Sequence, residues 1–113
     1  MSRLICAATD LLDGGDGLRF QVDTAGGAQA AFVLRWHGGV YAYLNQCAHV
    51  AIELDWNPGK FLDVDGEYVM CAAHGALYEP DSGRCVGGPC VGQALRRLMV
   101  SERNGNIYLE AEA

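Results

Sequence analysis

Short apolar runs bounded by glycine-rich turns limit how this chain of 113 residues can fold. In residues 18–22 apolar and polar side chains alternate, which is the period of a half-buried β-strand. Asn104-Gly105 separates two such runs and is a strong hairpin signal, because both residues tolerate positive φ. No long helical period occurs. The pattern predicts an all-β chain, with strands expected at residues 3–9, 18–22, 30–36, 40–44, 95–101 and 106–109.

Residues 46–90 break this pattern, because they are dense in Gly, Pro, Cys and His. Within them, Asp65-Gly66 indicates a hairpin between residues 61–64 and 67–70. A chain of this length fits one domain. We therefore expect a single domain over 1–113, with a basal β subdomain from residues 1–45 and 91–113 and an inserted, site-bearing subdomain from residues 46–90.

The charge balance excludes several classes of partner. The net charge is −6 and the pI is about 4.8. An acidic chain whose only adjacent basic pair is Arg96-Arg97 is a poor candidate for binding nucleic acid or an anionic membrane. The sequence has no signal-peptide pattern, and no run approaches the ~20 apolar residues of a membrane span. These features predict a soluble, cytoplasmic protein.

Two short segments pair a thiol with an imidazole: Cys47 with His49, and Cys71 with His74. Thiolates are soft, strongly donating ligands that suit iron–sulfur centres, whereas two Cys and two His also make a common structural zinc set. Zinc fingers usually keep two Cys together and then two His. The order Cys-His followed by Cys-His, on strand-rich flanks, favours iron–sulfur chemistry over zinc.

These segments resemble the paired C-x-H and C-x-x-H motifs of Rieske iron–sulfur proteins. Gly75 directly follows the second His, and Tyr78 stands where many members carry an aromatic residue. Residues 87–89, Gly-Gly-Pro, fall where the family places a proline loop over its cluster. The resemblance is strong over residues 44–90. It implies a Rieske-type fold, in which a basal antiparallel β-sandwich carries an inserted, loop-rich cluster-binding subdomain.

The resemblance also implies a [2Fe–2S] cluster and a role for each matching residue. Cys47 and Cys71 would ligate one iron, and His49 and His74 would ligate the other. Around these ligands it implies a supporting set of Gly75, Tyr78, Gly87, Gly88 and Pro89, in which the glycines let the backbone approach the cluster. Neutral imidazoles in place of two thiolates raise the reduction potential, to roughly −150 to +300 mV in such centres.

The sequence departs from the high-potential members of the family. Residues 50–52 supply no extra Cys for the disulfide of those members, and Ala76 replaces a Ser that donates a hydrogen bond to a bridging sulfide. Tyr78 could still donate its O–H to a cysteine sulfur. We therefore expect a low or intermediate potential. Residues 53–61 make the spacing between the pairs longer than usual. This insert could form part of a docking face or cover the core with Trp56 and Phe61, and we favour the covering role.

Three cysteines lie outside the expected ligand set. Cys6 falls in a strand and is expected to be a small buried apolar residue. Cys85 and Cys90 could pair as a disulfide or act as a redox-active thiol pair, although a reducing compartment favours the free thiols. His37, in a turn, is expected at the surface rather than as a ligand.

The leading hypothesis is a ferredoxin-like electron carrier between a reductase and an oxygenase or another acceptor, with Val50, Ala51 and Pro89 as a small contact patch. No pair of carboxylates indicates catalysis, and no small-molecule substrate is expected. Two alternatives remain open. One is a redox sensor, suggested by Cys85 and Cys90. The other is an accessory part of a larger oxidoreductase.

Overall fold

The computed structural model describes residues 3–24, 27–47, 53–55, 59–72 and 75–111. The expected ligands His49 and His74 lie outside these residues, as do Trp56, Val50 and Ala51. The predictions made for those five residues therefore have no structural outcome here. No helix in the described ranges is long and apolar enough to cross a membrane.

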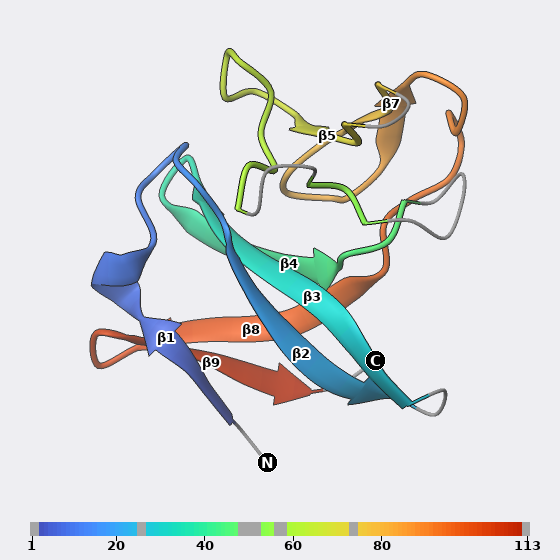
Figure 1. Cartoon of the computed structure of the whole chain (residues 1–113). Helices are drawn as coiled ribbons and strands as arrows, with labels where there is room; N and C mark the ends of the chain where they lie inside the picture. Colours follow the sequence, from blue (N-terminus) through green and yellow to red (C-terminus); the bar gives the residue numbers. More distant parts are fainter. Residues whose placement is uncertain (1–2, 25–26, 48–52, 56–58, 73–74, 112–113) are drawn as a thin grey trace.

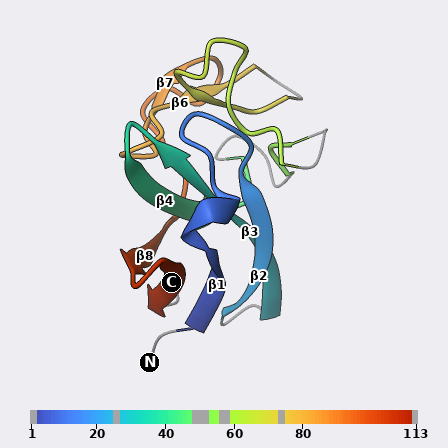
Figure 2. The ribbon, with the colours of Figure 1, turned by 90° about the vertical axis from the view of Figure 1, so that its left-hand side faces the viewer.

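The fold is nearly all β, as predicted, and its strands form two antiparallel sheets (Figure 1). The larger sheet has the order β1-β9-β8-β4-β3-β2, and its strands are β1 Arg3–Ala7, β2 Leu18–Thr24, β3 Gly27–Trp36, β4 Gly39–Leu44, β8 Arg97–Arg103 and β9 Asn106–Ala111. The smaller sheet has the order β5-β6-β7, from Val69–Met70, Leu77–Tyr78 and Cys85–Gly87. In both views the small sheet lies at one end of the molecule and the two termini lie toward the other (Figure 2).

Most sequence predictions of strands are confirmed, with shifted ends. The first strand stops at Ala7 rather than residue 9, because residues 8–10 form a 3-10 turn. The last predicted hairpin is present, and its turn residues Asn104 and Gly105 have φ of 55° and 76°. The hairpin at Asp65-Gly66 is present in its hydrogen bonds, from Asp63 N to Tyr68 O and from Met70 N to Phe61 O, although its regular strands are short.

Strand β3 is buried on both faces, because its alternating side chains enter two different cores. Ala31 and Val33 point into a basal core to which all six strands of the large sheet contribute. Phe32 and Leu34, on the opposite face, point into a second core under the small sheet. Strand β4 repeats the division, and its Tyr43 joins the second core. Strands β3 and β4 therefore form the base of the loop-rich end of the molecule.

The second core holds the expected cluster-binding region in place. Phe61 stacks on Phe32 with ring centroids 3.9 Å apart and an interplanar angle of 11°. This contact confirms the prediction that Phe61 covers the core. The Tyr43 hydroxyl donates a buried hydrogen bond to Pro80 O at 2.7 Å, and burial raises the pKa of this tyrosine. Strand β4 is thereby fixed to the loop that leads into β7.

Arg35 on β3 ties the basal sheet together. Its guanidinium donates two hydrogen bonds to the Glu102 carboxylate on β8, at 2.7 and 2.9 Å, and a third to Leu11 O at 3.2 Å. A bidentate arginine–carboxylate pair is stronger and more directional than a simple ion pair. The hydrogen bond from Arg35 holds the pKa of Glu102 below its usual range.

A lowered pKa in the folded state gives a testable dependence of stability on pH. The contribution of Glu102 is present above its ordinary pKa of 4.5 and is lost as the pH falls through its lower folded value. Glu102→Gln should therefore lower the free energy of unfolding at pH 7 and flatten its fall in acid. Urea unfolding at a series of pH values measures this, with Glu67→Gln at the exposed surface as the control. Parallel pH profiles for wild type and Glu102→Gln would contradict the pairing.

Candidate metal centre

The two expected cysteine ligands lie at the ends of strands from different sheets. Cys47 comes three residues after β4, and Cys71 directly follows β5. Both thiols are almost fully buried, with 3% and 0% of their surface exposed, in the second core. The pairing of β4 in the large sheet fixes the position of Cys47, and the pairing of β5 in the small sheet fixes the position of Cys71.

The loop after Cys71 is closed by its own backbone. Cys71 N donates to Ala76 O at 2.9 Å, and Gly75 N donates back to Cys71 O at 2.8 Å. Gly75 has a φ of +70°, a left-handed conformation that L side chains rarely adopt. The loop that contains the expected ligand His74 is therefore anchored at residues on both of its sides.

Tyr78 lies at the centre of a chain of sulfur contacts. Its buried hydroxyl oxygen is 3.3 Å from Cys47 Sγ and 3.1 Å from Cys90 Sγ. It belongs to the middle strand of the small sheet, where its backbone is paired with both Val69 and Cys85. The contact with Cys47 has the geometry expected if Tyr78 donates its O–H to a ligand sulfur.

The Gly87-Gly88-Pro89 loop packs against the loop after Cys71. A Cβ on Gly88 would lie 2.9 Å from Ala76 Cα and 3.4 Å from Gly75 O, which is too close for any other residue, and its φ is +89°. Gly87 differs, because a Cβ there would make only ordinary contacts with Leu77 at 3.6 Å. Pro89 is exposed. Close packing against Ala76 therefore requires a glycine at position 88 but not at position 87.

A buried polar network, which the sequence analysis missed, connects the two cysteine loops. Asn45 Oδ1 accepts a hydrogen bond from Leu54 N at 2.8 Å, and Leu54 O accepts one from Ala72 N at 3.0 Å. Leu54 therefore bridges a residue two positions before Cys47 and the residue after Cys71. Asparagines occur often in turns, so sequence alone gives no signal that Asn45 has this role.

The same network neutralises a buried carboxylate. Asp55 accepts hydrogen bonds from Asn45 Nδ2 at 2.8 Å and from Gly59 N at 2.9 Å, and Arg19 Nε lies 3.6 Å from it. Burial of a carboxylate is costly unless such partners are present. The long insert between the cysteine pairs is thus fixed to the basal sheet at residues 53–55 and at Gly59.

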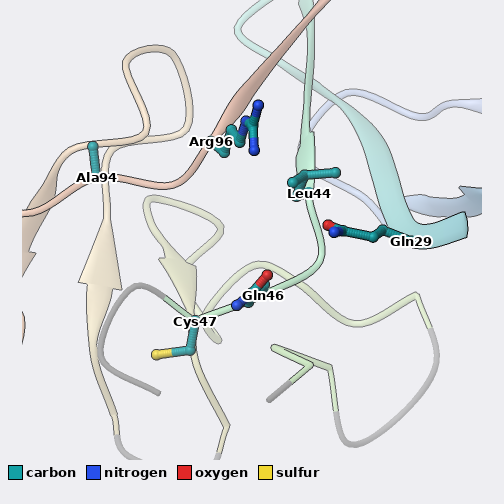
Figure 3. A pocket seen from close by; sticks show the side chains of 6 residues that line it. All are labelled: Gln29, Leu44, Gln46, Cys47, Ala94 and Arg96. Atoms are coloured by element: carbon teal, nitrogen blue, oxygen red, sulfur yellow. The ribbon is translucent and has the colours of Figure 1, made fainter. Parts of the chain in front are cut away.

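A hollow of about 260 Å³ opens beside Cys47, on the side away from its sulfur (Figure 3). In Figure 3 the Cys47 sulfur points away from the side chains of Gln46 and Arg96, which line this hollow. The thiol is instead directed toward the interior, where the Tyr78 hydroxyl lies. The Cys47 sulfur therefore does not point into this hollow.

The donors that the structure describes fit a soft metal centre. Cys47 and Cys71 are buried thiols on two loops that Leu54 joins, and one of them has an O–H group within hydrogen-bonding distance. Thiolates with hydrogen bonds to sulfur are the usual protein environment of an iron–sulfur cluster. The remaining thiol and imidazole side chains discussed above lie elsewhere, because Cys6 is buried in the basal core and His37 is exposed and stacks on Trp36.

The Asn45 network gives a test of how the cysteine loops are held. Asn45→Ala should lower the free energy of unfolding by about 1–3 kcal/mol, because it removes one of the hydrogen bonds to the buried Asp55 carboxylate and the side-chain oxygen that accepts from Leu54 N. Urea unfolding followed by circular dichroism measures the change. Asn106→Ala is the control, since the contact of that amide with the Tyr108 hydroxyl is long, at 3.5 Å, and equal losses in the two variants would contradict the network.

Solved structures with the same fold include ferredoxins and oxygenase complexes. The "Sphingomonas yanoikuyae B1 ferredoxin" has a TM-score of 0.77 and 19% identity, covering 99% of this chain and 100% of that chain. The "Ferredoxin of carbazole 1,9a-dioxygenase from Nocardioides aromaticivorans IC177" has a TM-score of 0.74 and 20% identity, covering 99% of each. A chain of the "Complex of reduced oxygenase and oxidized ferredoxin in carbazole 1,9a-dioxygenase" has a TM-score of 0.71 and 25% identity, covering 96% of this chain and 91% of its own length.

A match to one protein-family model covers most of the sequence. No curated protein matches the chain. The model of the Rieske [2Fe-2S] domain, however, matches residues 2–102. That range includes both Cys-His segments, the Gly-Gly-Pro loop, strands β1 to β7 and all but the last residue of β8. The chain therefore belongs to the Rieske [2Fe–2S] domain family.

Proposed function

We propose that this protein carries single electrons on a [2Fe–2S] cluster held by Cys47, His49, Cys71 and His74. Membership of the Rieske family implies the cluster. When bound, it supplies a centre that takes up and returns one electron. The observation that carries the proposal is the placement of Cys47 and Cys71 within a Rieske domain. Both are buried thiols, and hydrogen bonds through Leu54 connect their two loops.

The protein's own residues would set the conditions for that exchange. The second core excludes water from beneath both thiols, because Phe32, Leu54 and Tyr78 are fully buried there. The Tyr78 hydroxyl, 3.3 Å from Cys47 Sγ, would stabilise negative charge on that sulfur. The buried Ala76 side chain carries no hydrogen-bond donor, so the potential should lie at the low end for a Cys/His-ligated centre.

The proposed partners are a reductase that loads the electron and an oxygenase or another oxidoreductase that accepts it. Support comes from structural neighbours described as ferredoxins of dioxygenase systems, one of them in a complex with its oxygenase. The net charge of −6 would steer the protein toward a basic partner. We infer an electron carrier rather than an enzyme, acting in the cytoplasm.

A docking face is proposed at the exposed end of the small sheet. Val86 and Val91 are 46% and 64% exposed and line the same hollow, and Pro89 between them is also exposed. A patch of a few apolar side chains suits the small, short-lived interfaces of redox partners. We also propose a division into a cluster-binding subdomain at residues 46–90 and a basal subdomain formed by residues 1–45 and 91–113, with Val91 of the docking face at their boundary.

A redox titration followed by visible absorption tests the proposed function. We expect a reversible one-electron transition with a midpoint near or below roughly −150 mV, the lower end for such centres. Ala76→Ser should raise the midpoint, because it adds a hydroxyl donor beside the expected cluster. Ala94→Ser, at an exposed position outside the ligand loops, is the control and should leave the midpoint unchanged. The absence of a reversible transition, or a strongly positive wild-type midpoint, would contradict the proposal.

A further inference from the structure

We propose that Cys85 and Cys90 form a reversible dithiol–disulfide site, distinct from the cluster ligands, which a small peroxide oxidises and whose state reaches the cluster through Tyr78. Formation of the disulfide does not depend on the proposed function. Only the effect on the cluster rests on it.

The two sulfurs are already close together. Cys90 Sγ lies 2.8 Å from Cys85 Sγ, and both residues carry thiols in this structure. Backbone hydrogen bonds at Gln93 hold both ends of the segment, because Cys85 N donates to Gln93 O at 2.8 Å and Gln93 N donates to Cys90 O at 2.9 Å. A disulfide bond of about 2.05 Å therefore requires only a small movement of the side chains.

A small oxidant can reach one of the two thiols from solvent. Cys85 is 5% exposed and lines an open hollow of about 370 Å³ together with Val86 and Val91. Such a hollow is large enough for hydrogen peroxide, whose size is similar to that of water. Cys90 is only 1% exposed, and burial raises its pKa to about 11. We therefore assign the first oxidation to Cys85 and the second step to Cys90.

The reaction balances with hydrogen peroxide as the oxidant. The Cys85 thiolate attacks one peroxide oxygen, the O–O bond breaks, and the products are a sulfenic acid on Cys85 and one water. The Cys90 sulfur then attacks the Cys85 sulfur, forming the S–S bond and releasing a second water. Two electrons pass from the sulfurs to the peroxide, and both thiol protons end in water. A dithiol reductant reverses the change by thiol–disulfide exchange.

Tyr78 connects this pair to Cys47. In the dithiol form the Cys85 thiol donates to Gly87 O at 3.2 Å and the Cys90 thiol donates to Cys85 Sγ, so Cys90 offers lone pairs to the Tyr78 hydroxyl at 3.1 Å. The same hydroxyl is 3.3 Å from Cys47 Sγ, and it has one proton for two sulfurs.

Disulfide formation changes this competition. We expect the new S–S bond to hold Cys90 Sγ closer to Cys85, and so to favour donation of the Tyr78 hydroxyl proton to Cys47. A stronger hydrogen bond to a ligand sulfur raises the reduction potential of an iron–sulfur cluster. The disulfide form should therefore have the higher midpoint.

Peptide mapping by mass spectrometry tests the site itself. The holoprotein is treated anaerobically with one to two equivalents of hydrogen peroxide, then unfolded and alkylated. We expect a peptide that contains Cys85 and Cys90 two hydrogens lighter and unalkylated, restored by dithiothreitol, while Cys6 is alkylated throughout. The Cys85→Ser variant should show no such bridge. Full alkylation of Cys85 and Cys90 after peroxide, or their irreversible oxidation, would overturn the proposal.

Film voltammetry, scanned faster than the disulfide is reduced, tests the link to the cluster. The midpoint should be higher for the disulfide form than for the dithiol form, and the difference should disappear in Tyr78→Phe, which keeps the buried ring. An unchanged or lower midpoint would overturn the link. Loss of the cluster signal in both forms would refute the proposed function and the link together, whereas the mass measurement would still decide whether the disulfide forms.

Discussion

The burial of strands β3 and β4 on both faces is the constraint on which the rest of the structure depends. Along each strand, alternate residues such as Ala31 on β3 and Ala42 on β4 complete the basal core, and the residues that follow them, Phe32 and Tyr43, complete the core beneath the cysteine loops. Because side chains alternate along a strand, a shift of register by one residue would exchange the two sets. The same two strands therefore fix the basal sheet and the floor of the metal centre.

The sequence predicts regular elements well, because their signals are local. Period-2 alternation and the Asn104-Gly105 turn specify strands and a hairpin without reference to the rest of the chain. The pairing of Cys47 and Cys71 with nearby histidines is equally local. The bridge from Asn45 through Leu54 to Ala72 joins three separate segments, and no short pattern marks it. Long-range polar contacts of this kind depend on the completed fold, which explains why sequence analysis missed them.

The cysteines outside the ligand set illustrate the same limit. Sequence analysis left open whether Cys85 and Cys90 interact, because five positions of separation in a glycine-rich loop allow many geometries. The structure places their sulfurs 2.8 Å apart and puts Tyr78 between Cys90 and Cys47. A thiol pair and an expected ligand thus share one hydroxyl group, and the environment of the ligand sulfur depends on residues far from it in sequence.

The central claim is that two thiolates and two imidazoles hold the cluster, and pulsed electron paramagnetic resonance of the dithionite-reduced protein tests it most directly. Combined with iron and zinc analysis, the measurement reports the cluster and its nitrogen ligands together. The account predicts two irons per chain and hyperfine coupling to two imidazole nitrogens. One zinc per chain without iron, or a cluster that shows no nitrogen coupling, would contradict it.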